Sequence, residues 1–385
     1  MKSRIITALL LSIAFLASCD KKTDTVTVNI QVKAPTLSES DSIYITGNLS
    51  ELGSWQADGR LMKHIGNGIW KTQLQLPKET IIEYKFTKGS WETEAAQSDG
   101  KPMENAVLTV AEDTLTTTLI THWRAGEALP IEGQITGDVA YHKQMTYEGI
   151  LDRDVIVWLP PNYNNNPEQR YSVLYMQDGQ NIVDPLTASY KVDWQIDETA
   201  TRLVEEGQIE PIIVVGIYCT DKRTYEYTPG EGSDAYMAFV TEKLKPFIDQ
   251  TYRTKTEREY TAVGGSSAGG LISMMLAWEY PEVFSKAICM SPAFKIKGDN
   301  ITIDYVTPVK ESYKKDLQLY IDNGGVGLEA RLQPGVDAMI KVLKEKGFKE
   351  GVDLFYTVDQ EAQHSEKYWA ERMPNALLWL FGKEK

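Results

Sequence analysis

The stretch Gly264-Gly-Ser-Ser-Ala-Gly-Gly270 decides the architecture of the larger, C-terminal part of the chain. An apolar run ends just before it at Val263, and a helical pattern begins near Ala268. Only Ser267 has a glycine two positions before it and another two positions after it. This spacing between a strand and a helix is typical of a strained turn, in which small neighbours let the backbone approach closely. We therefore predict that Ser267 is a nucleophile.

Around this turn, residues 134–385 alternate apolar runs with amphipathic helical stretches. The apolar runs are nearly continuous, which is typical of strands buried on both faces. The alternation predicts a mostly parallel sheet with helices on both sides, an α/β architecture. Strands are expected at 154–159, 171–176, 212–218, 260–264, 287–290 and 317–322, and helices at 234–252, 268–280, 333–346 and 365–381.

The histidines narrow the choice of a general base. In hydrolases with this serine turn, the catalytic residues follow the chain order serine, acid, histidine. Of the four histidines, only His364 lies beyond Ser267, after an apolar run at 352–358 and before a predicted helix. We predict His364 as the base and a structural role for the other three, which are His64, His122 and His142.

The acid that orients the histidine should follow the strand at 317–322. Its task is to hold the imidazole in one tautomer and to stabilise its cation. Three carboxylates compete there, Asp322 at the strand end, Glu329 in a glycine-rich loop and Asp337 on the next helix. We prefer Glu329, because a flexible loop could bring it inward, and keep Asp322 as the alternative acid.

Two backbone N–H groups are needed to stabilise an oxyanion. Ala268 should supply one, because it follows the nucleophile at the start of a helix. The loop at 177–181, after the strand at 171–176, should supply the other from Gly179 or Gln180. No group of His, Cys or carboxylate residues has the spacing of metal ligands, so we expect neither a metal nor another cofactor.

Residues 26–121 differ in pattern from the α/β part of the chain. Residues 26–121 form short alternating runs separated by turn signals such as Asp58-Gly59 and Gly66-Asn67-Gly68. This pattern predicts a small β-sandwich domain. Residues 122–133, with Gly126 and Pro130, are expected to form a linker to the α/β domain at 134–385.

The N-terminus predicts where in the cell the protein is located. Lys2 and Arg4 precede a mostly apolar stretch at 5–16, which is too short to span a bilayer but suits a secretory signal. It ends in Leu16-Ala-Ser-Cys19, which resembles the lipobox of bacterial lipoproteins. That resemblance implies removal of residues 1–18, lipidation of Cys19, a tether at 19–25, and a place in the bacterial cell envelope, facing the periplasm or on the cell surface.

Charge and cysteine content exclude several classes of protein. The chain has 40 basic and 54 acidic residues and a net charge of −14, which argues against binding to nucleic acid or to an anionic membrane surface. Membrane contact is therefore expected through the lipid only. Three cysteines in 385 residues cannot build a disulfide framework.

Residues 134–382 resemble the esterase D and enterochelin-esterase-like α/β-hydrolases, which include carbohydrate esterase family 1. The resemblance implies that Ser267 is the nucleophile and His364 the base, and that the loop at 177–181 lies near the oxyanion. The position of the acid varies within the family, which leaves Glu329 and Asp322 both open. The matching segments are Leu174-Tyr-Met-Gln-Asp-Gly-Gln-Asn181, Arg223-Thr-Tyr-Glu-Tyr-Thr-Pro229, the serine turn with Tyr280-Pro-Glu-Val-Phe284, and His364-Ser-Glu-Lys-Tyr-Trp369.

The first domain resembles a starch-binding module of carbohydrate-binding family 20. The matching segments are Tyr44-Ile-Thr-Gly-Asn48, Glu51-Leu-Gly-Ser-Trp55, Gly68-Ile-Trp70, Glu83-Tyr-Lys-Phe86 and Trp91-Glu92. The resemblance implies glucan binding by Trp55, Lys85 and Trp91, with Asn105 as a weaker match. Indole rings stack well on pyranose faces. The alternative is a domain that serves only as a spacer or a lid.

Together these features predict a lipid-anchored serine esterase that removes acyl groups, acetyl or feruloyl, from carbohydrates or cleaves another small ester, through an acyl-enzyme. A siderophore esterase is the first alternative, since enterochelin esterases also carry an N-terminal β-domain. A glycan-binding surface lipoprotein without catalytic activity is the alternative of another class.

Overall fold

The computed structural model describes residues 25–97, 100–124, 134–297 and 302–383. The expected signal at 1–18, the lipidation site Cys19 and nearly all of the tether lie outside the described residues, as does 125–133 of the expected linker. Within the described residues, no helix combines the length and apolar character needed to cross a membrane.

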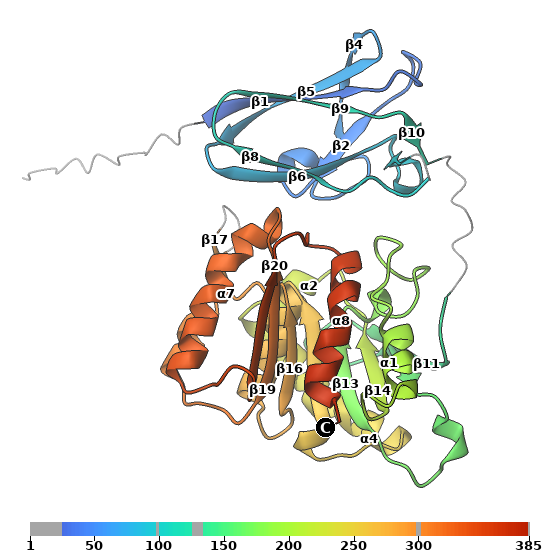
Figure 1. Cartoon of the computed structure of the whole chain (residues 1–385), viewed down its shortest axis with the longest axis vertical. Coiled ribbons are helices and arrows are strands. Elements are labelled where there is room, and N and C mark those ends of the chain that lie inside the picture. The colour runs from blue at the N-terminus through green and yellow to red at the C-terminus, as the bar shows by residue number, and fades with distance from the viewer. Residues whose placement is uncertain (1–24, 98–99, 125–133, 298–301, 384–385) are drawn as a thin grey trace, which may run out of the picture.

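The N-terminal domain is a sandwich of two four-stranded sheets (Figure 1). The inward side chains of both sheets form one apolar core. A short pair between β7 (Ala95–Ala96) and β10 (His122–Trp123) extends the sandwich past residue 121, where the sequence predicted its end. The first sheet has the order β4 (Lys63–Gly66), β5 (Ile69–Pro77), β1 (Thr25–Lys33), β9 (Thr114–Leu119), and the second β3 (Arg60–Leu61), β2 (Tyr44–Gly47), β6 (Thr80–Thr87), β8 (Ala106–Val110).

The C-terminal domain is built on one eight-stranded sheet, in which the six strands from β14 to β20 in the sheet order run parallel. The first two strands pair antiparallel to each other and to β14. This confirms the predicted fold class, a mostly parallel α/β-hydrolase sheet preceded by a β-sandwich. The strand order is β11 (Asp138–Met145), β12 (Arg153–Leu159), β14 (Ile212–Ile217), β13 (Ser172–Gln177), β15 (Thr261–Ser266), β16 (Lys286–Met290), β19 (Gln318–Gly324), β20 (Leu354–Asp359).

Helices cover both faces of this sheet because its strands are apolar on both sides. In β12, Val155 and Val157 join the core beneath one set of helices, whereas Ile156 and Trp158 join the core beneath the other. Helices α1 (Ile196–Glu205) and α8 (Glu366–Phe381) pack on the second face. The remaining helices are α2 (Arg223–Tyr227), α3 (Glu231–Ala238), η5 (Phe239–Leu244), α4 (Lys245–Thr251), α5 (Ala268–Glu279), α6 (Val306–Glu311) and α7 (Leu328–Glu345).

Helix α7 begins at Leu328, before the predicted start at Gln333. Pro334 lies inside the helix, where it costs one backbone hydrogen bond, yet the buried stripe from Leu332 to Leu343 continues across it. Glu329 therefore lies in the first turn of a helix, not in a flexible loop as the sequence analysis expected. The backbone of Glu329 is therefore fixed by helix α7.

The sandwich lies over the carboxyl edge of the parallel sheet (Figure 1). Lys367, after β20, pairs with Glu104 of the sandwich at 2.7 Å. The ring of Tyr190, in the segment after β13, meets Trp91 edge to face at 6.4 Å between ring centroids. Since strand ends in α/β sheets commonly carry functional loops, the sandwich covers the edge where a site is expected.

Candidate active site

Ser267 occupies the sharp turn between β15 and α5. Its backbone has φ 57° and ψ −122°, a conformation that is strained for any residue other than glycine. The Ser267 side chain is half-buried, whereas the neighbouring Ser266 is 3% exposed. Ser267 is thus the accessible serine of the pair.

The two glycines of the motif are required by close backbone contacts. A Cβ on Gly265 would lie 2.8 Å from the carbonyl carbon of Gly269. A Cβ on Gly269 would lie 3.2 Å from Cβ of Gln177 and 3.1 Å from Oδ2 of Asp178. The missing side chains let the loop after β13 pack directly against the serine turn.

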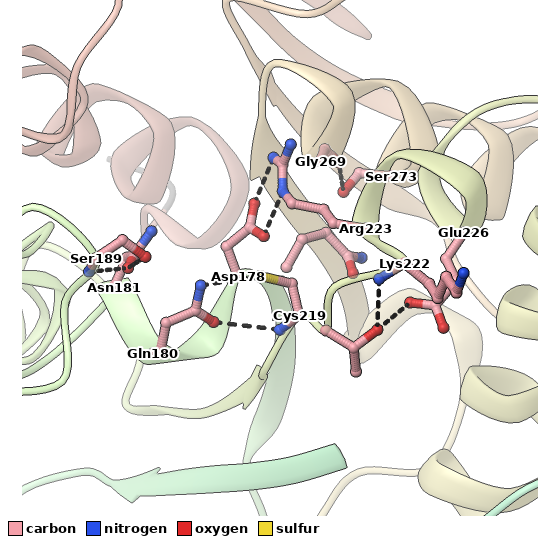
Figure 2. Close-up of polar contacts among 12 residues, drawn as sticks. Asp178, Gln180, Asn181, Ser189, Cys219, Lys222, Arg223, Glu226, Gly269 and Ser273 are labelled. Atoms are coloured by element: carbon pink, nitrogen blue, oxygen red, sulfur yellow. Dashed lines mark hydrogen bonds and ion pairs between the residues drawn. The ribbon is translucent and has the colours of Figure 1, made fainter. Parts of the chain in front are cut away.

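The backbone groups expected to stabilise an oxyanion come from these two packed segments. Ala268 is the first residue of α5, so its N–H has no acceptor within the helix. Gly179 and Gln180 form a short 3-10 turn after β13, and a Cβ on Gly179 would lie only 2.2 Å from the carbonyl carbon of Gly216. Gln180 is fixed by its side chain, because its Oε1 accepts the N–H of Cys219 at 3.2 Å (Figure 2).

A partly buried ion pair fixes the position of the same loop. Asp178, in a left-handed conformation with φ 55°, accepts two hydrogen bonds of 2.7 Å from Arg223 (Figure 2). The guanidinium lies 5.1 Å from the ring centroid of Tyr227. No role was predicted for Asp178 or Arg223, although both lie in segments that carried the family resemblance. Bidentate pairing gives this loop a defined position.

His364 and Glu329 are brought together from separate elements. The distance from His364 Nδ1 to Glu329 Oε1 is 3.2 Å. Glu329 is fully buried, and it also accepts hydrogen bonds from Ser291 Oγ at 2.6 Å and from the N–H of Gly324 at 3.1 Å. Burial raises the pKa of Glu329, but His364 and these two donors outweigh burial and hold the pKa below its usual value. Glu329 is therefore ionised at neutral pH.

The alternative acid has other partners. Asp322 is fully buried at the end of β19, and its Oδ2 accepts a hydrogen bond from Arg372 Nε at 2.9 Å. Burial raises the pKa of Asp322, although Arg372 and the hydroxyl of Tyr320 oppose this shift. Asp337 is exposed on α7 and bonds to Gln333. Of these three carboxylates, Glu329 is the one in hydrogen-bond contact with His364.

Ser291 links the two buried acids, and nothing in the sequence singled it out. Its Oγ donates to Glu329 and accepts from Trp369 Nε1 at 3.0 Å and from Arg372 Nη2 at 3.0 Å. The ring of Trp369 also meets that of His364 edge to face at 5.0 Å. Among these partners of Ser291, Trp369 had been noted in the sequence, as the last residue of the family-like segment that begins at His364.

In the described part of the chain, no hydrogen bond joins the Ser267 hydroxyl to His364. Such bonds commonly shorten only when a substrate is bound. The other histidines have separate environments: His64 packs on Trp70, His122 bonds to Thr121 on the surface, and His142 bonds to Tyr252.

The residues expected to bind glycan are largely engaged within the protein. Lys85 pairs with Glu94 at 3.1 Å, and Asn105 donates to Oε1 of Glu83 at 2.6 Å. Trp91 meets Tyr190 of the other domain, and Trp55 is half-buried in a turn. Lys85 and Asn105 therefore already have partners before any sugar arrives.

Three carboxylates at the start of α1 could offer oxygen ligands to a metal ion. Oxygen atoms of Asp193, Asp197 and Glu198 lie within 4.8 Å of one another. The spacing of these three residues in the sequence did not predict a metal site. Burial raises the pKa of Asp193 to about 6 and that of Asp197 to about 8. Protonation of Asp197 near neutral pH therefore reduces the charge of this cluster.

The sheet, the strained serine turn and the buried Glu329–His364 pair define an α/β-hydrolase. Residues 151–380 match the sequence profile of the family described as "Putative esterase". The chain belongs to this family. It is therefore a carboxylic ester hydrolase. Residues 25–119 match the profile described as "Starch binding domain".

Individual relatives are distant. A protein of Bacillus subtilis called "Uncharacterized protein YbbA" is 23% identical over 253 residues, which is 61% of this chain and 94% of that protein. An "Endo-1,4-beta-xylanase/feruloyl esterase" of Xylanibacter ruminicola is 25% identical over 177 residues. That match covers 42% of this chain but only 24% of the relative.

Two solved structures share the fold. The enterobactin esterase of Shigella flexneri, solved with 2,3-di-hydroxy-N-benzoyl-glycine, superimposes with a TM-score of 0.56 at 14% identity, over 91% of this chain and 92% of that one. A ferulic acid esterase superimposes with a TM-score of 0.52 at 20% identity, over 63% of this chain and 98% of that one.

Proposed function

We propose that the chain is a serine esterase that works through Ser267, His364 and Glu329. The Ser267 hydroxyl attacks the ester carbonyl while His364 takes its proton and then passes it to the departing alcohol. Water, deprotonated by the same histidine, releases the acyl group from Ser267. The observation that carries the proposal is the 3.2 Å contact of His364 with a buried, ionised carboxylate. This contact suits Glu329 to orient the imidazole and stabilise its cation.

The developing oxyanion is stabilised by backbone N–H groups of Ala268 and of the Gly179–Gln180 turn. Gln177 and Asp178, which directly precede this turn, pack closely on the serine turn, and Gly179 packs on Gly216. This packing supports that role, because preorganised donors need no rearrangement during the reaction. The positive end of α5 adds a favourable potential at the same place.

We propose acetyl or feruloyl groups on carbohydrates as the acyl substrates. The starch-binding-type domain supports a sugar partner, and the name of the Xylanibacter relative joins a feruloyl esterase to a xylanase. Since the sandwich covers the carboxyl edge of the sheet, the sugar would lie between the domains, near Trp91 and Tyr190. This arrangement favours short acylated oligosaccharides over long polymers.

A siderophore ester is the second candidate. The enterobactin esterase matches this chain across both domains, whereas the ferulic acid esterase matches 63% of it. Lys85 and Asn105 already pair with other residues of the sandwich, which weakens the case for a sugar at these two side chains.

Acyl release separates the candidates. The purified protein is incubated with acetylated xylo-oligosaccharides, feruloylated arabino-oligosaccharides, the parent polymers and a cyclic catecholate ester, with Ser267→Ala as the blank. Release from the oligosaccharides that the blank lacks supports the carbohydrate esterase. Release from the catecholate ester alone favours the second candidate, and no release from any ester contradicts both.

We also propose that Cys19 carries a lipid that anchors the protein in the cell envelope, on the basis of the motif at residues 16–19. Labelled palmitate should enter the wild-type protein and not Cys19→Ala. Equal labelling of both would contradict the anchor.

A further inference from the structure

Glu83 of the sandwich is a buried carboxylate on the face of its sheet that points away from the sandwich core. Its neighbours along β6, Ile82 and Tyr84, belong to that core, and alternation along a strand directs Glu83 to the opposite side. Glu83 is nevertheless only 2% exposed, because the α/β domain covers it. Carboxylates are rarely buried so completely unless they have partners.

The partners of Glu83 lie on both sides of the domain interface. Its Oε1 accepts a hydrogen bond of 2.6 Å from Asn105 of the same domain. Its carboxylate also faces the start of α7, where the backbone N–H of Leu328 partly offsets the rise that burial causes in the pKa of Glu83. Oε2 lies 3.1 Å from the point where a Cβ on Gly327 would sit, so the absent side chain makes room for it.

Helix α7 has no cap from its own sequence. Its N-cap residue is Gly327, with φ 67° and no side chain that could accept a hydrogen bond. An acceptor at this position commonly stabilises a helix, and a negative charge there interacts favourably with the helix dipole. The sandwich domain places the Glu83 carboxylate, a hydrogen-bond acceptor, at this position.

The capped turn also carries the acid of the proposed triad. Glu329 directly follows Leu328, and its Oε1 lies 3.2 Å from His364 Nδ1. Val107, the partner of Glu83 on β8, packs against the same turn, 3.5 Å from the Cβ position of Gly327. Any movement of this turn would displace Glu329 from the histidine.

We propose that Glu83 is a positioning residue of the active site: it caps α7 from the other domain and thereby holds Glu329 against His364. Docking of the sandwich then completes the hydrolase, and Asn105 serves to orient Glu83 instead of binding a sugar. This inference rests on the proposed function of Glu329 and His364.

The test compares Glu83→Ala with Glu83→Gln in the full chain, using a small activated ester that makes few contacts with the sandwich. Gln keeps an acceptor for the N–H of Leu328, whereas Ala removes it. We expect Glu83→Ala to lower kcat by about 10- to 100-fold with little change in KM, since misplacement by about 1 Å costs this much. Glu83→Gln should stay within about threefold of the wild type.

Hydrogen exchange gives a readout that does not depend on catalysis. The peptide around Leu328 should exchange faster in Glu83→Ala than in the wild type and remain protected in Glu83→Gln. Asn105→Ala leaves Glu83 in place but removes the hydrogen bond that orients it, so we expect a smaller loss of kcat. This variant replaces Glu83→Ala in the test if Glu83→Ala does not fold. Glu104→Gln is the matched control, because its pair with Lys367 crosses the same interface but is exposed.

Unchanged kcat and unchanged exchange in Glu83→Ala would overturn the inference. Equal losses in Ala and Gln would also overturn it, since they would assign the effect to charge and not to capping. A rise in KM alone would identify Glu83 as a substrate contact instead. An inactive wild type would contradict the proposed function. Hydrogen exchange would then still test whether Glu83 caps α7.

Discussion

Glu329 receives hydrogen bonds from Ser291 and Gly324 in addition to its contact with His364. Both donors lie at the ends of strands or directly after them, so the position of the carboxylate is set before a substrate binds. Its lowered pKa follows from the same contacts. At the scale of single residues, the site is thus an ionised buried acid held by several donors around one histidine.

Glu329→Gln should retain the fold and lose most of the activity. The amide can still accept from Ser291, but it no longer carries the charge that stabilises the imidazolium. We expect kcat on an activated ester to fall by ~10³-fold or more. Asp337→Asn, which alters an exposed carboxylate of the same helix, should stay within about twofold. Comparable rates in all three proteins would remove Glu329 from the mechanism.

At the scale of elements, the central strands and the longest helices could be predicted, whereas strand β11 and helices α1, α2 and α6 were missed. The apolar runs and the serine turn placed the strands correctly because both depend on local sequence. The start of α7 was placed too late, because Glu83 supplies its cap from another domain. Ser291 and Arg372 could not be found for a similar reason, since their roles arise from contacts between distant segments.

The start of α1 shows how burial makes stability depend on pH. Asp197 is fully buried and accepts the N–H of Thr136 at 2.7 Å. Burial raises the pKa of Asp197 to about 8 in the folded protein, whereas the pKa of an aspartate in the unfolded chain is about 4. The folded state therefore keeps a proton that the unfolded state releases, and the stabilisation present below about pH 4 is lost as pH rises toward about 8.

Asp197→Asn should remove this loss, because the amide accepts the same N–H without titrating. Thermal unfolding of the variant and the wild type at pH 5 and pH 8.5 measures the effect. We expect the Tm of the variant to exceed that of the wild type by more at pH 8.5 than at pH 5. The same difference at both values would show that Asp197 does not titrate in this range.

At the scale of the whole molecule, the sandwich contacts the α/β domain beside the proposed active site. Glu83 and Trp91 of the sandwich contact residues that follow β19 and β13. The sequence predicted the fold class of both domains, and it left open whether the sandwich binds glycan or serves only as a spacer or a lid. Residue type alone could not show that the other domain covers the face that carries Glu83, since docking depends on the tertiary arrangement.

The central claim is that Ser267 is the nucleophile of this chain, and labelling by a fluorophosphonate tests it most directly. The probe bonds covalently to activated serines, and mass spectrometry of the digested protein locates the adduct. Ser266→Ala is the matched control, because Ser266 is adjacent but buried. We predict an adduct on Ser267 in the wild type and in Ser266→Ala, and none in Ser267→Ala. An adduct on another residue, or labelling of Ser267→Ala at the wild-type rate, would contradict the mechanism.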